Sequence, residues 1–132
     1  MKKRMLYLIL LLITIVLEIL PYGAVCNFAN PEGEAWRRTY SYFDLTPFGY
    51  ANFSPFITAL MTVAIIVLII IYCLNEKYSL AKVIKLMLSV SIVLSLCPLL
   101  LGIRYFSVTG VLITLSLLSE LILFCLAVRK RV

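Results

Sequence analysis

The sequence predicts an all-α integral membrane protein, a bundle of four transmembrane helices with an aromatic-rich extracytoplasmic loop that is expected to hold a small β-hairpin. Three observations predict this class. The 132-residue chain is 64% hydrophobic, whereas a soluble domain is about 45–50% apolar. Its apolar residues form four long runs, and most of its basic residues lie at the ends of those runs. A chain of this length cannot hide so much apolar surface from water, so lipid is its natural solvent.

Each apolar run is expected to cross the membrane as a helix, because a span needs about 20 mostly apolar residues. Four runs cannot close a barrel, and lipid leaves no backbone group unpaired. The first run is short, but the basic side chains before it can snorkel and lengthen it. The single membrane domain, 1–132, then contains helices at about 5–20, 55–74, 81–103 and 106–128, with an external loop at 21–54. Ser54 is expected to cap the second helix, with Pro55 at its first position.

The Lys and Arg residues predict the orientation. Nine of the twelve lie at the N-terminus, in the 75–85 region and at the C-terminus, while Arg37, Arg38 and Arg104 do not. Since basic residues accumulate on the cytoplasmic side, we expect a multi-pass plasma-membrane protein with both termini in the cytoplasm. A competing interpretation makes the first run a cleaved signal peptide, because it has a basic start and is followed by "PYGAVC".

The charge pattern and the cysteines argue against several classes of function. The net charge of +6 is not arranged as a basic face with interleaved aromatics, so nucleic acid is not an expected partner. The chain has no histidine and no Cys-x-x-Cys pair, which argues against zinc and dithiol chemistry. No nucleophile–base pair or phosphate loop is present either. We therefore expect no cofactor and no enzymatic activity, with the lipid bilayer, another membrane protein or a second copy of the chain as partner.

Two carboxylates, Glu18 and Glu120, fall within the apolar runs. A charged side chain at the membrane centre costs about 2–3 kcal/mol or more, so each is a candidate functional residue. Two structural interpretations compete with a function. Glu18 matches Arg104 in depth, which predicts an ion pair near the external surface. Glu120 matches the depth of Ser89 and Ser91, which predicts a protonated, hydrogen-bonded carboxyl.

Small and hydroxyl-bearing residues predict how the third and fourth helices pack. Ser91 and Ser95 share one face of the third helix with Pro98 and Gly102. Helix association in lipid relies on such residues more than on hydrophobicity. We interpret them as packing positions, and a pore lining is the alternative.

The loop 21–54 holds too many aromatics for a linker or a disordered segment. The rings are expected either to lie at headgroup level as an interfacial belt or to fold over the bundle mouth as a lid. The candidate interfacial or partner-binding residues are Trp36, Tyr40, Tyr42, Phe43, Phe48 and Tyr50. "TPFG" suits a type I turn, so the predicted hairpin pairs about Arg38–Leu45 with Tyr50–Phe53.

The loop sequence "YGAVCNFANPEGEAWRRTYSYFDLTPFGYANFSPF" resembles that of uncharacterised small four-helix membrane proteins of Gram-positive bacteria. The resemblance covers about the first half of the chain. It implies a bacterial plasma-membrane location and no particular activity. The layout is also similar to that of claudin-like proteins, but their paired loop cysteines and Gly-Leu-Trp motif are missing. Small multidrug transporters carry a Glu in the first of four spans, whereas Glu18 lies too near the end of its run.

These observations together predict a non-enzymatic interaction or accessory protein that acts through the external loop or the helices. The alternative is a small transporter or channel subunit that uses the intramembrane residues Glu120, Glu18 and Arg104.

Overall fold

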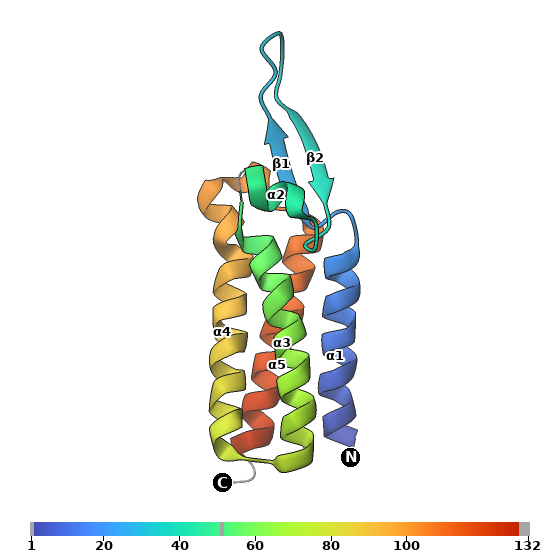
Figure 1. The fold of residues 1–132 in the computed structure, drawn as a ribbon, viewed down its shortest axis with the longest axis vertical. Coiled ribbons are helices and arrows are strands. Elements are labelled where there is room, and N and C mark those ends of the chain that lie inside the picture. Colours follow the sequence, from blue (N-terminus) through green and yellow to red (C-terminus); the bar gives the residue numbers. More distant parts are fainter. Residues whose placement is uncertain (1, 51, 130–132) are drawn as a thin grey trace.

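The computed structural model describes residues 2–50 and 52–129, with side chains described for 5–48 and 52–129. Its elements in chain order are α1 (Lys2–Ile19), β1 (Ala24–Phe28), β2 (Trp36–Tyr40), α2 (Leu45–Tyr50), α3 (Ser54–Asn75), α4 (Tyr78–Leu101), η1 (Ile103–Tyr105) and α5 (Val108–Arg129). The long helices α1, α3, α4 and α5 lie side by side and form a bundle (Figure 1). Helix α1 begins and α5 ends at one end, the termini end, and the strands lie at the opposite, hairpin end.

Within the described residues, three helices are long and apolar enough to cross a membrane. They are α3, α4 and α5, with 22, 24 and 22 residues. The apolar part of α1, Met5–Ile19, is shorter than these spans. The prediction of a mostly helical fold with a small hairpin is therefore confirmed, and three of the four expected spans have the length and composition of membrane-crossing helices.

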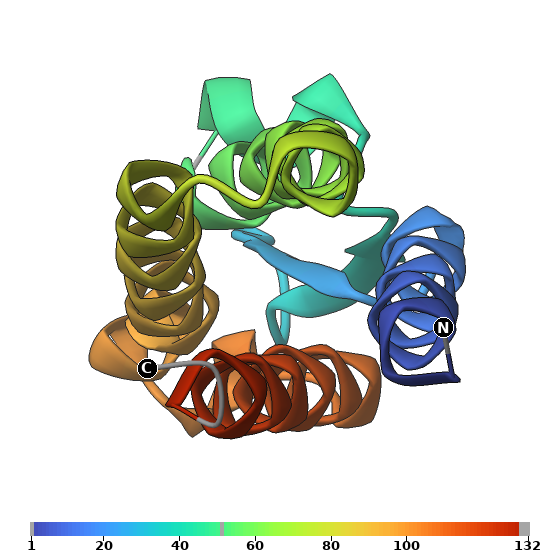
Figure 2. The same ribbon diagram turned by 90° about the horizontal axis from the view of Figure 1, so that it is seen from below.

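The four long helices form a closed ring in which each contacts two neighbours, as the view along the bundle shows (Figure 2). Every helix turns one stripe of buried residues toward the axis, with the same spacing of four, three and four. The stripes are Tyr7, Leu11, Thr14 and Glu18 on α1; Thr58, Thr62, Ile65 and Ile69 on α3; Ile84, Leu88, Ser91 and Ser95 on α4; and Ile113, Leu117, Glu120 and Phe124 on α5. This spacing is that of a coiled-coil seam, so the helices pack nearly parallel to one another.

The outer surface of the bundle is apolar on all four helices. Leu12, Val67, Val93 and Leu115 are each more than half exposed. Large exposed apolar patches are rare on soluble monomers. The bundle therefore presents to its surroundings the surface that lipid solvates, and it keeps its few polar side chains inside.

Helix α3 begins at Ser54, and Pro55 occupies the first turn. The expected capping by Ser54 is wrong, because Ser54 is itself helical. The cap oxygen comes instead from Asn52, whose Oδ1 accepts hydrogen bonds from the Ser54 N–H at 3.1 Å and the Ser54 hydroxyl at 2.7 Å. Asn52 thereby satisfies a backbone donor that has no partner within the helix.

The small sheet pairs β1 with β2 in antiparallel register, from Ala24 opposite Tyr40 to Phe28 opposite Trp36. The predicted pairing of Arg38–Leu45 with Tyr50–Phe53 is wrong. The strands are instead joined across "NPEG", where the Gly33 N–H donates to the Asn30 carbonyl at 3.5 Å. Both tetrapeptides place Pro second and Gly fourth, as type I turns favour, so turn chemistry alone did not distinguish them.

"TPFG" lies within α2 because Asp44 starts a helix there. The Asp44 Oδ1 accepts a hydrogen bond from the Thr46 N–H at 2.8 Å, as an N-cap residue does. Pro47 follows in the first turn, where its missing N–H costs nothing. The short helix then lies across the hairpin end beside the start of α3 (Figure 1).

Candidate functional site

The most unusual feature of the core is a group of polar side chains around two buried carboxylates, which we name the carboxylate cluster: Thr14 and Glu18 of α1, Thr62 of α3, and Ser116 and Glu120 of α5. Thr14 and Glu18 are four residues apart and therefore lie one above the other on the same helix face. Ser116 and Glu120 repeat this spacing on α5. The coiled-coil spacing of the helices thus brings two acidic residues 102 positions apart in the sequence into one group.

Glu18 is completely buried and bonded through only one carboxylate oxygen. Its Oε1 accepts a hydrogen bond from the Thr62 hydroxyl at 2.8 Å. That hydroxyl also lies 3.0 Å from the Thr58 carbonyl in its own helix, so two acceptors share one hydrogen. The Glu18 Oε2 is buried and has no hydrogen-bond partner among the described residues.

Glu120 repeats this arrangement on the other side of α1. It is 2% exposed, and its Oε1 accepts a hydrogen bond from the Thr14 hydroxyl at 2.9 Å. Thr14 Oγ1 in turn lies 2.6 Å from the Ser116 hydroxyl, which can donate to it. The Glu120 Oε2 is buried without a partner in the part of the chain that the structure describes.

More hydroxyl groups lie at the interface of α4 and α5. Ser95 Oγ and Thr114 Oγ1 are 2.9 Å apart. Each hydroxyl also lies within hydrogen-bonding distance of a backbone carbonyl oxygen of its own helix. The Ser91 hydroxyl is buried and, over residues 2–50 and 52–129, accepts and donates no hydrogen bond. Because buried polar groups in proteins are nearly always paired, three oxygens without a partner among the described residues require a physical explanation.

Tyr42 closes the cluster at the hairpin end. Its side chain is 1% exposed, and its N–H donates to the Glu18 carbonyl at 2.9 Å. The ring fits only because residue 23 is glycine, since a Cβ there would lie 2.7 Å from the Tyr42 Cδ1. Burial, followed by the nearby Glu18 charge, holds the pKa of the Tyr42 hydroxyl above its ordinary range.

The termini end of the core is apolar. Phe124 packs edge-to-face against Tyr7 and Tyr72, with ring centroids 5.8 and 5.4 Å apart. Leu88 and Ile69 are fully or almost fully buried at the same end. The carboxylate cluster is thus enclosed by a tyrosine at one end and by a hydrocarbon and aromatic layer at the other.

The two predicted structural partners of the carboxylates are wrong. Glu18 does not pair with Arg104, which is exposed in η1 while Glu18 points into the bundle toward Thr62. Glu120 does not reach Ser89 or Ser91. It bonds Thr14, and the exposed Ser89 donates to its own helix at the Lys85 carbonyl.

Matching residues by their depth along the helices did not identify the actual contacts, because helix rotation decided them. Successive helical residues are about 100° apart, so Ser89, next to the buried Leu88, faces outward. Sequence reasoning also missed Thr14 and Thr62, the two donors. A signal for Thr14 was available, because it lies four residues before Glu18 on the same helix face.

The five aromatic candidates of the loop whose side chains the structure describes do not form one belt or one lid. Trp36 is 53% exposed at the far end of the hairpin, where it stacks on Phe28 at 5.3 Å and lies under Arg38. Tyr40 and Phe43 are partly buried against the core, and Tyr42 is fully inside it.

Phe48 packs edge-to-face on Phe53 and Phe56, with centroids 5.0 and 5.3 Å apart, and so holds α2 onto α3. The side chain of Tyr50 lies outside the described residues. Rings of the same loop therefore have different environments: one is exposed, others pack against the helices, and Tyr42 covers the carboxylate cluster.

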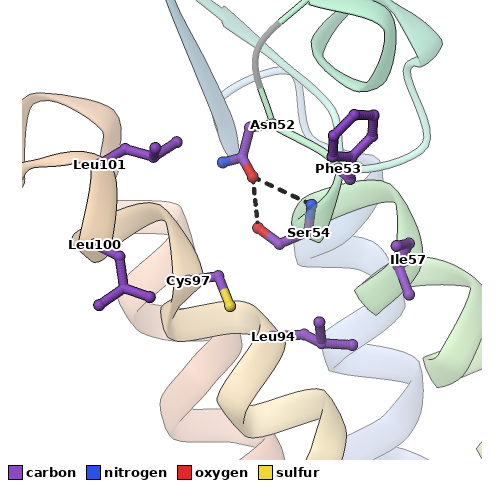
Figure 3. A pocket seen from close by; sticks show the side chains of 8 residues that line it. All are labelled: Asn52, Phe53, Ser54, Ile57, Leu94, Cys97, Leu100 and Leu101. Atoms are coloured by element: carbon purple, nitrogen blue, oxygen red, sulfur yellow. Dashed lines mark hydrogen bonds between the residues drawn. The ribbon is translucent and has the colours of Figure 1, made fainter.

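A pocket of about 350 Å³ opens between α3 and α4 at the hairpin end (Figure 3). Its walls are mostly aliphatic and include the Cys97 thiol, with Asn52 and Ser54 bonded to each other at the rim. Because its polar groups satisfy one another, the pocket does not share the unpaired oxygens of the carboxylate cluster.

Cys26 lies in β1 and is completely buried. Burial, followed by the charge of Asp44, raises the pKa of its thiol. A buried, protonated thiol is a poor nucleophile and a poor metal ligand. In the described residues, no three His, Cys, Asp or Glu side chains gather as ligands for a metal ion.

No protein-family model, curated protein or solved structure matches this chain.

Proposed function

We propose that the chain is a plasma-membrane protein of four spans with both termini in the cytoplasm, α1 being the fourth span. Helix α1 contacts α3 and α5 along the bundle, and its outward residues Leu12 and Val16 are each 59% exposed and apolar. A helix packed between two spans shares their lipid surroundings. The basic residues Lys77, Lys82 and Lys85 lie at the same end as the start of α1, which supports a cytoplasmic termini end.

Within this membrane protein, we infer that the carboxylate cluster takes up and releases protons, and that the chain is a small proton-coupled transporter or channel subunit. One observation carries the proposal: Glu18 and Glu120 each keep one buried oxygen that has no hydrogen-bond partner among the described residues. An ionisable side chain in a span is costly, and a carboxylate oxygen left unbonded adds to that cost. A proton is the smallest ligand that removes both costs.

The hydroxyls of the cluster suit this role. Thr14 bonds Glu120 and, four residues further along α1, Glu18 bonds Thr62, so the two acids are linked through one helix. Intramembrane Asp and Glu side chains form proton relays in pumps and transporters, and here each acid accepts a hydrogen bond from a threonine hydroxyl. Transport additionally requires that Tyr42 and the apolar layer at the termini end move aside alternately, so that the carboxylate cluster is exposed first to one side and then to the other.

Proton flux into liposomes that contain the purified chain and a trapped pH dye tests the proposal. Glu120→Gln keeps the shape and the hydrogen bond from Thr14 but cannot ionise, and we expect it to reduce flux at least about tenfold, within the range attributed to a positioned acid or base. Glu18→Gln is expected to do the same. Ser119→Ala is the matched control, because Ser119 is exposed on α5 beside Glu120. No flux in the wild type, or equal flux in all variants, would remove the transporter proposal.

A second candidate function, an interaction or accessory role, is supported by the far end of the hairpin. Trp36 and Phe28 pack against each other at the strand pair farthest from Ala24 and Tyr40, and Trp36 is more than half exposed. Exposed aromatics at a protruding tip are typical of protein contacts. Membrane cross-linking should lose a partner on Trp36→Ala but not on Tyr22→Ala, a comparably exposed ring at 60%. An unchanged set of partners counts against this role.

A further inference from the structure

A basic pocket lies between η1 and the end of the hairpin strands that is farther from Ala24 and Tyr40, and it is distinct from the carboxylate cluster. It has a volume of about 410 Å³ and is lined by Asn27, Ala35, Arg37, Arg104 and Tyr105. Asn27 and Arg37 are directly opposite each other in the sheet register, so their side chains lie on the same face of the hairpin. Arg104 and Tyr105 come from η1, the turn between α4 and α5. Two guanidinium groups from distant parts of the sequence therefore meet at one cavity.

Neither arginine is neutralised within the described residues. Arg37 donates one hydrogen bond, from Nη2 to the Phe106 carbonyl at 3.3 Å, which anchors it beside η1 and leaves its other N–H groups available. No carboxylate forms an ion pair with Arg37 or Arg104 over the part of the chain that the structure describes. Glu34, the acidic residue nearest to Arg37 in sequence, lies outside β2 in the exposed turn region.

The surroundings of the pocket are those of a membrane border. Leu100, Ile103 and Val108, which flank Arg104 in the chain, are 87%, 86% and 80% exposed. Such exposed aliphatic side chains at the end of two spans face acyl chains, whereas the arginines beside them face water and headgroups. Arginine at this level is well placed to hold a phosphate, because its planar fork binds phosphate oxygens in pairs.

We propose that this pocket binds a negatively charged phosphate group, carried by an outer-leaflet phospholipid or by a small soluble phosphate. The volume is in the range of small-molecule sites. Arg37 and Arg104 supply the charge, and the Asn27 amide supplies a further donor. The proposal does not depend on proton transport, since none of its residues belongs to the carboxylate cluster.

Native mass spectrometry of the full chain in detergent tests the proposal. Phosphatidylglycerol is added, and diacylglycerol with the same acyl chains serves as the phosphate-free control. We expect the wild type to retain phosphatidylglycerol and not diacylglycerol. Arg37→Gln with Arg104→Gln should reduce this retention at least about tenfold, as expected when charge-assisted hydrogen bonds are lost.

Arg38→Gln is the matched control. It removes the same charge from the adjacent residue of β2, but Arg38 points to the opposite face of the hairpin, over Trp36. Retention by Arg38→Gln should equal that of the wild type. Equal losses in Arg38→Gln and in the double variant, or no loss in either, would overturn the proposal, as would equal retention of the two lipids.

Adding glycerol phosphate to the same sample separates the two sources of the phosphate. Displacement of the lipid by glycerol phosphate identifies the phosphate group alone as sufficient, whereas displacement only by a second phospholipid assigns the site to lipid. Both outcomes support the pocket.

If the double variant fails to fold, Ala35→Glu replaces it. Ala35 is exposed and outside β2, so a carboxylate can be placed in the pocket with both arginines intact. Undiminished retention in Ala35→Glu would contradict the proposal.

Discussion

The two halves of the bundle core differ in chemistry although they are built from the same four helices. Toward the hairpin end, the inward stripes carry Glu18, Thr62 and Ser95, and hydroxyls bond carboxylates across the helices. Toward the termini end, the same stripes carry Phe124 and Ile69, and the contacts are aromatic and aliphatic. The helix spacing continues unchanged from one half to the other.

This difference shows that the two halves meet different requirements. The buried side chains named above in the termini half are aromatic and aliphatic, and close packing of such side chains holds helices together in lipid. In the part of the chain that the structure describes, the hairpin half leaves three buried oxygens unbonded, at Glu18, Ser91 and Glu120. Unpaired buried oxygens lower stability, so the termini half is expected to contribute more to stability than the hairpin half.

The largest expected effect is in the apolar half. Phe124→Ala removes a fully buried ring and both edge-to-face contacts, and should lower the free energy of unfolding by about 3–5 kcal/mol. Leu126→Ala is the control, because Leu126 lies two residues away and is 53% exposed toward lipid. Unfolding in mixed detergent micelles measures both. A similar loss in the two variants would mean that the apolar half is not the stabilising one.

An intermediate effect is expected where a hydroxyl supports a carboxylate. Thr62→Val keeps the shape of the side chain but leaves Glu18 without its donor, and should cost about 1–3 kcal/mol. Combining it with Glu18→Leu should recover much of this loss, because no buried acceptor then remains unpaired. Thr58→Val is the control, since Thr58 donates only to the Ser54 carbonyl of its own helix. Strict additivity of Thr62→Val and Glu18→Leu would argue that the hydrogen bond between these residues contributes little.

The smallest effect concerns the boundary of the polar half, where Tyr42 seals it. The pKa of Tyr42 is raised on folding, so its contribution to stability is fully present below the unfolded value, about 10, and is lost as the pH rises through the folded value. The wild type should therefore lose stability above about pH 10, with up to about 1.4 kcal/mol per pH unit from this one group. The comparison is with Tyr42→Phe, which has no hydroxyl to ionise. Parallel pH profiles of unfolding for the two proteins would show that the ring is not buried as described.

The apolar runs could be located from sequence because hydrophobicity over about 20 residues is a local property. Helices α3, α4 and α5 lie where those runs lie. The hairpin was placed in the wrong segment because two Pro–Gly tetrapeptides compete, and only the capping by Asp44 assigns one of them to a helix. The two carboxylates were recognised as candidate functional residues from their positions alone. The two threonine hydroxyls that donate hydrogen bonds to them were not recognised as their partners.

Composition by itself determined that this chain has a lipid-facing exterior and that Glu18 and Glu120 are costly where they stand, because transfer of a side chain out of water depends on its own chemistry. Only the tertiary structure decided that the two acids belong to one cluster and that Tyr42 rather than Trp36 covers it. It also decided that Arg104 lines the same pocket as Arg37 and does not pair with Glu18. Those contacts depend on how far each helix is rotated about its axis, and the rotation is set by all four inward stripes packing at once.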